Sequence, residues 1–141
     1  MGYIKLFEAW YRGYTSNTIK LSYVWLTENK NQAYVYSIIN NATYGGGEIT
    51  KTFKINLKGK RILDLNHYDM DDRFSESELE NFLEEIEMEY EVDNLFDIME
   101  DDIPLSRLVN KILKELMYKY DGIKIEEDGN KTICVNINIL V

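Results

Sequence analysis

The chain of 141 residues has one cysteine, one histidine and no apolar run long enough to cross a membrane as a helix. With Cys134 alone, an intramolecular disulfide is excluded, and its alternating apolar surroundings predict a small residue of the core. One cysteine and one histidine also exclude a zinc site built from these two residue types. The first residues lead directly into a strand pattern without signal-peptide features, so we expect a soluble protein that works in the cytoplasm.

Charge is distributed unevenly along the chain, whose formal net charge is −9. Residues 69–102 hold 16 acidic residues and one basic residue, Arg73, whereas the rest of the chain holds 9 acidic and 15 basic residues. Nonspecific binding to phosphates requires clustered lysine and arginine, so we expect no direct binding to nucleic acid. The acidic segment favours docking on a protein with a basic surface, and a merely solvated helix face is the alternative interpretation.

Hydrophobic residues make up 45% of the chain and aromatic residues 13%, which predicts one folded domain over residues 1–141. The spacing of the apolar residues predicts the elements of this domain. They are a strand or short helix up to Tyr11, a strand at 21–26, a helix at 28–40, strands at 48–57 and 61–65, helices that begin at Ser75 and Pro104, and a terminal hairpin across 127–130. This order indicates an α+β fold with an acidic helical segment at 69–102.

Two of the helices have recognisable starts. Thr27 is the expected N-cap of the helix at 28–40, whose predicted buried face holds Ala33, Tyr36, Ile39 and Asn40. Ser75 and Glu78 have the spacing of a capping box. The buried stripe expected after it is Leu79, Phe82, Leu83, Ile86 and Tyr90, with one more turn at 95–99.

Arg12 is the most informative charged residue, because it ends an aromatic and apolar run and is followed at once by Gly13. This placement predicts a guanidinium at a strand end, where its planar fork of donors can bind phosphate or carboxylate. The start of the following helix offers free N–H groups to the same anionic ligand. The alternative is an ordinary ion pair between Arg12 and a surface carboxylate.

Several short motifs follow one another along most of the chain. They are Tyr11-Arg12-Gly13, then Trp25-Leu26-Thr27 with Ala33 and Tyr36, then Lys54-Ile55-Asn56-Leu57 and Ile62-Leu63-Asp64-Leu65, and finally Tyr120-Asp121-Gly122-Ile123. In this order they resemble the small bacterial and phage proteins of the ADP-ribosyltransferase fold, some of which are phage anti-CRISPR enzymes. The resemblance implies a split β-sheet core with helices packed at its sides.

The resemblance also implies a function, that of an NAD-dependent mono-ADP-ribosyltransferase that modifies a protein. If the chain is phage-encoded, inhibition of a defence complex in the host cytoplasm is one such role. Arg12, beside Gly13, would neutralise the pyrophosphate of NAD or hold the nicotinamide ribose. Thr27 would orient the arginine or the ribose, and Tyr36 or its neighbour Tyr34 would pack on the nicotinamide ring.

Such a transfer requires a carboxylate that stabilises the positive charge developing on the ribose. Many active members carry a glutamate at the start of the last strand pair, where this chain has Asn130-Lys131-Thr132-Ile133. Asp121 is therefore the first candidate beside Arg12, because the step Tyr-Asp-Gly-Ile matches the small phage members. Glu126 and Glu127 stay open as candidates, and since they alternate in direction only one of them can face a cleft.

The acidic segment supports a second, non-catalytic function. A chain with this charge could inhibit a partner by mimicking nucleic acid and docking on its basic nucleic-acid-binding surface. The two functions differ at Arg12 and Asp121, which only the enzyme requires.

Overall fold

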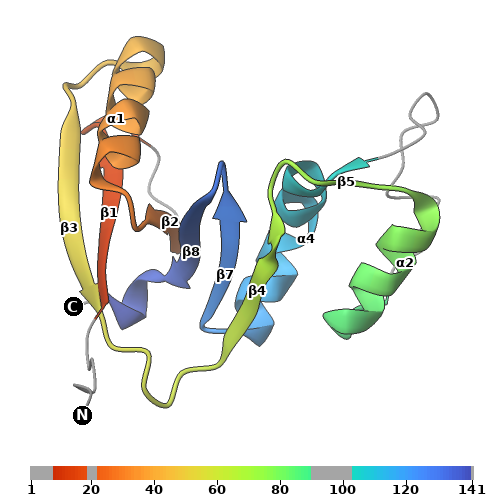
Figure 1. The fold of residues 1–141 in the computed structure, drawn as a ribbon. Coiled ribbons are helices and arrows are strands. Elements are labelled where there is room, and N and C mark those ends of the chain that lie inside the picture. The colour runs from red at the N-terminus through yellow and green to blue at the C-terminus, as the bar shows by residue number, and fades with distance from the viewer. Residues whose placement is uncertain (1–7, 19–21, 90–102, 141) are drawn as a thin grey trace.

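A computed structural model of the chain describes residues 8–18, 22–89 and 103–140. The described part is an α+β fold, as the sequence predicts, with a six-stranded sheet and three α-helices (Figure 1). The expected turn at 95–99 and the expected burial of Tyr90 lie outside the described residues.

The sheet has the strand order β3-β1-β2-β8-β7-β4. Its strands are β1 (Glu8–Tyr14), β2 (Tyr23–Thr27), β3 (Ile49–Ile55), β4 (Ile62–Asp69), β7 (Gly122–Glu127) and β8 (Asn130–Asn136). Strands β4 and β7 are parallel and the other neighbours are antiparallel, so the predicted terminal hairpin is confirmed. The short strands β5 (Arg73–Phe74) and β6 (Ile103–Pro104) pair with each other in a separate sheet.

The join between β1 and β2 is the weak point of the sheet. Strand β1 pairs with β3, and β2 pairs with β8, over their whole lengths. Strands β1 and β2 share the single residue pair Tyr11–Thr27, and Arg12 is the first residue of β1 beyond it. The six strands therefore form one sheet rather than two separate ones, but the sheet is nearly divided at this position.

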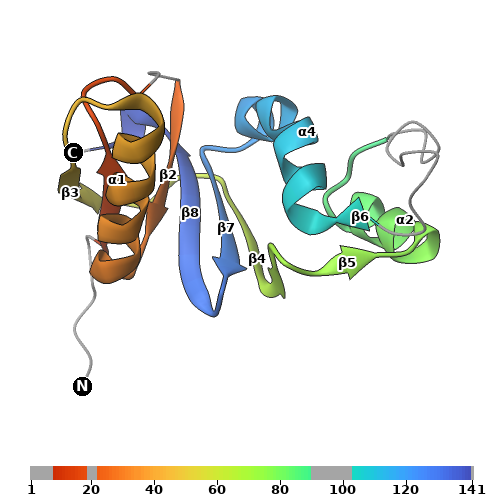
Figure 2. The ribbon, with the colours of Figure 1, turned by 90° about the horizontal axis from the view of Figure 1, so that it is seen from above.

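Helix α1 (Lys30–Tyr44) lies directly on β1 because Gly13 has no side chain there (Figures 1 and 2). A Cβ at residue 13 would stand 1.6 Å from the carbonyl oxygen of Ala33. The buried residues of α1 are the small Ala33 and Ser37, and Asn40 Nδ2 donates to the carbonyl oxygen of Gly13 at 3.3 Å. The predicted buried face of α1 is thus partly wrong, since Ile39 is 54% exposed. The helix packs so closely on β1 that only small side chains fit between the two elements.

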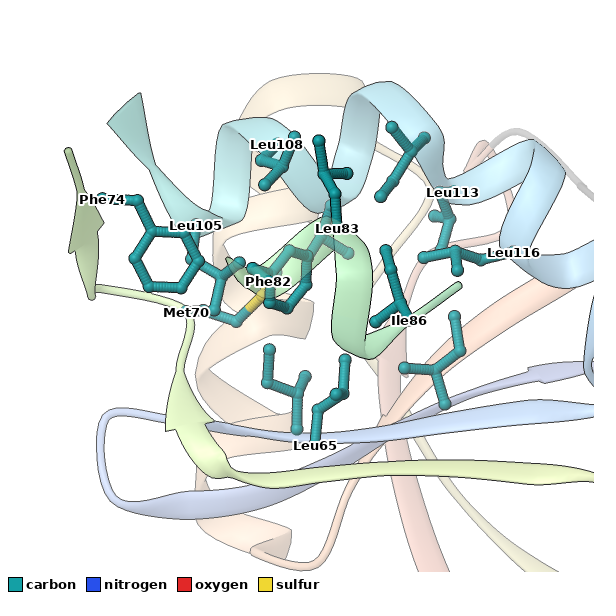
Figure 3. Close-up of a cluster of buried hydrophobic side chains, with 14 of the residues drawn as sticks. Leu65, Met70, Phe74, Phe82, Leu83, Ile86, Leu105, Leu108, Leu113 and Leu116 are labelled. Atoms are coloured by element: carbon teal, nitrogen blue, oxygen red, sulfur yellow. The ribbon is translucent and has the colours of Figure 1, made fainter. Parts of the chain in front are cut away.

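Helices α2 (Glu76–Glu85) and α4 (Leu105–Lys119) form the larger core over β4 and β7. The predicted capping box of Ser75 and Glu78 is confirmed, whereas Pro104 is the N-cap of α4 instead of its first residue. Figure 3 shows the side chains of both helices meeting Leu65 of β4. Cys134 is fully buried in this core, as expected.

A smaller core holds β1 and β2 together where their hydrogen bonds end. It joins side chains of β1, β2, β3 and β8 with the final 3-10 turn (Ile137–Ile139), and its members are Trp10, Leu26, Ile55, Ile133, Val135 and Ile139. Packing therefore replaces strand pairing across the divided part of the sheet. None of the helices in the described ranges is both long and apolar enough to cross a membrane.

We predict that Gly13→Ala destabilises the protein strongly, because the added Cβ and the carbonyl oxygen of Ala33 cannot both keep their places. The expected loss is on the order of 3 kcal/mol or more in the free energy of unfolding, measured with urea. Gly59→Ala is the matched control: residue 59 has a φ of 74° but no atom within 4 Å of an added Cβ. This control should lose only about 1–2 kcal/mol, from backbone strain. Equal losses in both variants would contradict the close packing of α1 on β1.

Candidate functional site

A cavity of about 240 Å³ lies where β1 and β2 separate. Four elements line it: β1, β2, helix α1 and the hairpin of β7 and β8. The lining residues are Tyr11, Arg12, Gly13, Thr18, Trp25, Leu26, Thr27, Tyr36, Asn40, Glu127 and Thr132. The structure therefore brings together four of the residues selected from the sequence, namely Arg12, Gly13, Thr27 and Tyr36.

Arg12 supplies a positive charge to this cavity. Its guanidinium lies over the ring of Tyr14, 5.5 Å from the centroid. Burial lowers the pKa of Arg12, and interactions with Tyr14 and Cys134 partly offset this effect. Within the described ranges no carboxylate forms an ion pair with it. A partly buried guanidinium without a carboxylate is suited to an anionic ligand, which favours the ligand-binding interpretation over the surface ion pair.

Glu127 brings a carboxylate to the same cavity, where Tyr36 is its neighbour. Burial raises the pKa of the Tyr36 phenol well above its ordinary value, and the charge and hydrogen bonding of Glu127 raise it further. Asp128 and Asp71 act on the phenol in the same direction, so these two carboxylates lie near Tyr36 as well. The phenol of Tyr36 therefore keeps its proton and can donate it to the carboxylate of Glu127.

Thr27 is the last residue of β2 and is not the N-cap of α1, which corrects the prediction. The N-cap is Asn29, whose Oδ1 accepts from the N–H groups of Asn31 at 2.9 Å and Gln32 at 3.2 Å. The hydroxyl of Thr27 accepts from the Asn29 N–H at 3.2 Å and donates to Gln32 Oε1. Thr27 thus fixes the junction between β2 and α1 while it lines the cavity.

Two selected residues lie outside the cavity. Tyr34 is 52% exposed on α1 and is not among the lining residues. Asp121 precedes β7, whereas Glu127 ends it, so roughly 20 Å of strand separates them. The Oδ2 atom of Asp121 accepts the Arg61 N–H at 2.8 Å, a bond that ties the chain before β4 to the start of β7. Of the three carboxylates left open by the sequence, Glu127 is the one that lines the cavity.

A second cavity of about 470 Å³ shares Arg12 and Thr18 with the first. Its other walls come from β1, β2, β3, the loop after β1 and the final turn: Tyr14, Thr15, Ser16, Val24, Ile49, Phe53, Ile137 and Leu140. No motif in the sequence indicated it, because these residues are widely separated along the chain. Arg12 is therefore placed between a small cavity with mixed polar and aromatic walls and a larger, mostly apolar one.

In the part of the chain that the structure describes, no group of three or more histidine, cysteine, aspartate or glutamate residues is placed to hold a metal ion. Comparisons of the chain with models of protein families, with curated proteins and with solved structures found no match. The resemblance to ADP-ribosyltransferases therefore depends on the short motifs alone.

We predict that Glu127→Gln lowers the pKa of Tyr36, because it removes a negative charge that opposes ionisation of the phenol. The pKa should stay above its ordinary value, since burial of the phenol remains. Titration of tyrosine ring carbons by NMR measures the change. Tyr68 is the control in the same sample: burial and Glu85 raise its pKa to about 12, and it should not respond to the substitution. An unchanged Tyr36 would show that Glu127 does not face it.

Proposed function

We propose that the chain binds NAD in the cleft between β1 and β2 and acts as a mono-ADP-ribosyltransferase on a protein target. One observation carries the proposal. Arg12, which has no carboxylate partner among the described residues, and Glu127 line the same cavity at the point where the two strands separate. A cation for the diphosphate and a carboxylate for the reacting ribose are the two groups that this chemistry requires.

In this proposal NAD is a substrate that supplies ADP-ribose and releases nicotinamide. Arg12 binds the diphosphate through charge-assisted hydrogen bonds. Glu127 stabilises the positive charge that develops on the ribose as the bond to nicotinamide breaks. Tyr36 orients Glu127 through its protonated phenol, and Trp25 offers an aromatic wall to the nicotinamide ring.

The sizes of the two cavities support a ligand with two parts. Small-molecule sites commonly measure about 300–1,000 Å³. The cavity of about 470 Å³ lies in this range, and the cavity of about 240 Å³ is smaller. In our proposal the smaller cavity takes the nicotinamide and its ribose, the apolar one takes the adenosine, and Arg12 holds the diphosphate between them.

The choice of Glu127 replaces the sequence-based choice of Asp121. A carboxylate can stabilise a developing charge only from within a few ångströms, and Asp121 lies at the other end of β7. Neighbouring residues of β7 point to opposite faces of the sheet, so Glu126 cannot face the cavity that Glu127 lines.

The proposed target is a protein with a basic surface, modified in the cytoplasm. Exposed acidic side chains of α2 and its surroundings would face it: Asp71, Asp72, Glu76, Glu78, Glu80, Glu84, Glu85, Glu87 and Glu89. Asp71 acts on the phenol of Tyr36, which puts one end of this acidic surface beside the cavity. The same surface supports the second candidate, a non-catalytic inhibitor that docks on a basic nucleic-acid-binding surface and needs no NAD.

We predict that the purified protein binds NAD and releases nicotinamide. Substitution of Arg12 should affect the binding of NAD, whereas substitution of Glu127 should affect the rate of nicotinamide release. Arg12→Ala should weaken NAD binding roughly tenfold or more, because a charge-assisted contact with the diphosphate is lost. Glu127→Gln should bind NAD nearly as the wild type but release nicotinamide about a hundredfold more slowly or worse. Calorimetry measures the binding, and chromatography measures the nicotinamide.

Two further variants serve as matched controls for the carboxylate. Glu126→Gln should leave both measurements unchanged, because residue 126 is not among the residues that line the cavity. Asp121→Asn should also keep activity, since an amide oxygen can still accept the Arg61 N–H. Loss of turnover in Asp121→Asn but not in Glu127→Gln would restore the sequence-based assignment. A folded wild type that binds no NAD would contradict the enzyme and favour the non-catalytic inhibitor.

A further inference from the structure

The outer face of α1 is apolar and no described residue covers it. Five of its exposed residues are apolar or aromatic and are spaced as one stripe along the helix: Tyr34 is 52% exposed, Val35 49%, Ile38 40% and Ile39 54%, and Ala42 is exposed as well. From its second residue to its last, the helix carries no charged side chain. The solvated face of a surface helix ordinarily carries charged and polar residues, so this stripe has the character of an interface.

We infer that this stripe is a homodimer interface, in which α1 packs antiparallel against α1 of a second copy of the chain. Exposed charges of opposite sign stand near the two ends of α1: Lys30 begins the helix, and Glu48 follows the turn after it. Neither forms an ion pair within the described part of the chain. A twofold axis across the middle of α1 brings Lys30 of each copy to the end where Glu48 of the other copy stands.

The charge of the helix ends favours the antiparallel arrangement over a parallel one. In antiparallel packing, each positive helix N-terminus lies beside the negative C-terminus of its neighbour. Parallel packing would instead place the two Lys30 side chains together at one end and the two Glu48 side chains at the other. The exposed pattern at positions 35, 38, 39 and 42 also has the spacing with which paired helices interdigitate.

The net charge of −9 does not oppose this dimer, because the acidic side chains of α2 are far from the stripe. Helix α1 and the acidic helix α2 lie at opposite ends of the molecule in both views (Figures 1 and 2). Contact through α1 therefore keeps the two acidic regions apart. Pairing through strand β3, the outermost described strand at this end, is disfavoured by the exposed Lys51 and Lys54.

Sedimentation of the full chain over a wide range of concentrations tests the inference. The wild type should pass from a mass of 16.7 kDa towards twice that value as its concentration rises. Ile38→Glu should raise the dissociation constant roughly tenfold or more, because the dimer would bury an unpaired charge twice. Tyr118→Glu is the matched control, since Tyr118 is 93% exposed on α4, away from the stripe, and this variant should dimerise as the wild type does.

A charge exchange tests the orientation. Lys30→Glu should weaken the dimer, and adding Glu48→Lys to the same chain should restore it, because the pair is re-formed with opposite signs. A mass of 16.7 kDa at every concentration would overturn the inference, as would a double variant that is no tighter than Lys30→Glu alone. Neither experiment involves NAD, so its outcome is independent of the proposed enzymatic function.

Discussion

Helix α1 can lie against β1 because residue 13 is a glycine, and the geometry of the candidate cleft depends on this contact. The carbonyl oxygen of Ala33 occupies the space that a side chain at residue 13 would need. Because α1 packs closely on β1, Tyr36 and Asn40 of the helix line the cavity where β1 separates from β2. A larger residue at position 13 would move the helix outward and remove one wall of the cavity.

The charged groups of the cleft come from opposite ends of the chain and are held by different parts of the fold. Arg12 stands on β1, beyond the single residue pair that joins β1 to β2. Glu127 ends β7, which pairs with both β4 and β8 and lies under the large core made by α2 and α4. The core of α2 and α4 thus supports the carboxylate, while α1 supports the arginine strand and supplies Tyr36 between them.

Local sequence patterns predicted the structural features that depend only on residues close together in the chain. The capping box of Ser75 and the terminal hairpin needed only spacing and turn residues. The buried face of α1 could not be predicted, because it is set by contact with Gly13, twenty residues before Ala33. The local motif points to Asp121 because it carries no information on which end of β7 lies at the cavity. Alternation along the strand separates Glu127 from Glu126, but it puts residues 121 and 127 in the same direction and cannot separate those two. The local context indicates Arg12 but predicts the wrong place for it: Arg12 is not at a strand end, because β1 continues through Gly13 to Tyr14 and stays paired with β3.

The most direct test of a ligand in this cleft uses the two tryptophans of the chain. Trp25 lines the cavity beside Arg12, whereas Trp10 is 5% exposed in the smaller core and lines neither of the two cavities. In proton–nitrogen NMR spectra, titration with NAD should shift the indole signal of Trp25 to saturation and leave that of Trp10 in place. If both indole signals stay unchanged in an excess of NAD, the cleft does not bind it and the proposed activity is wrong.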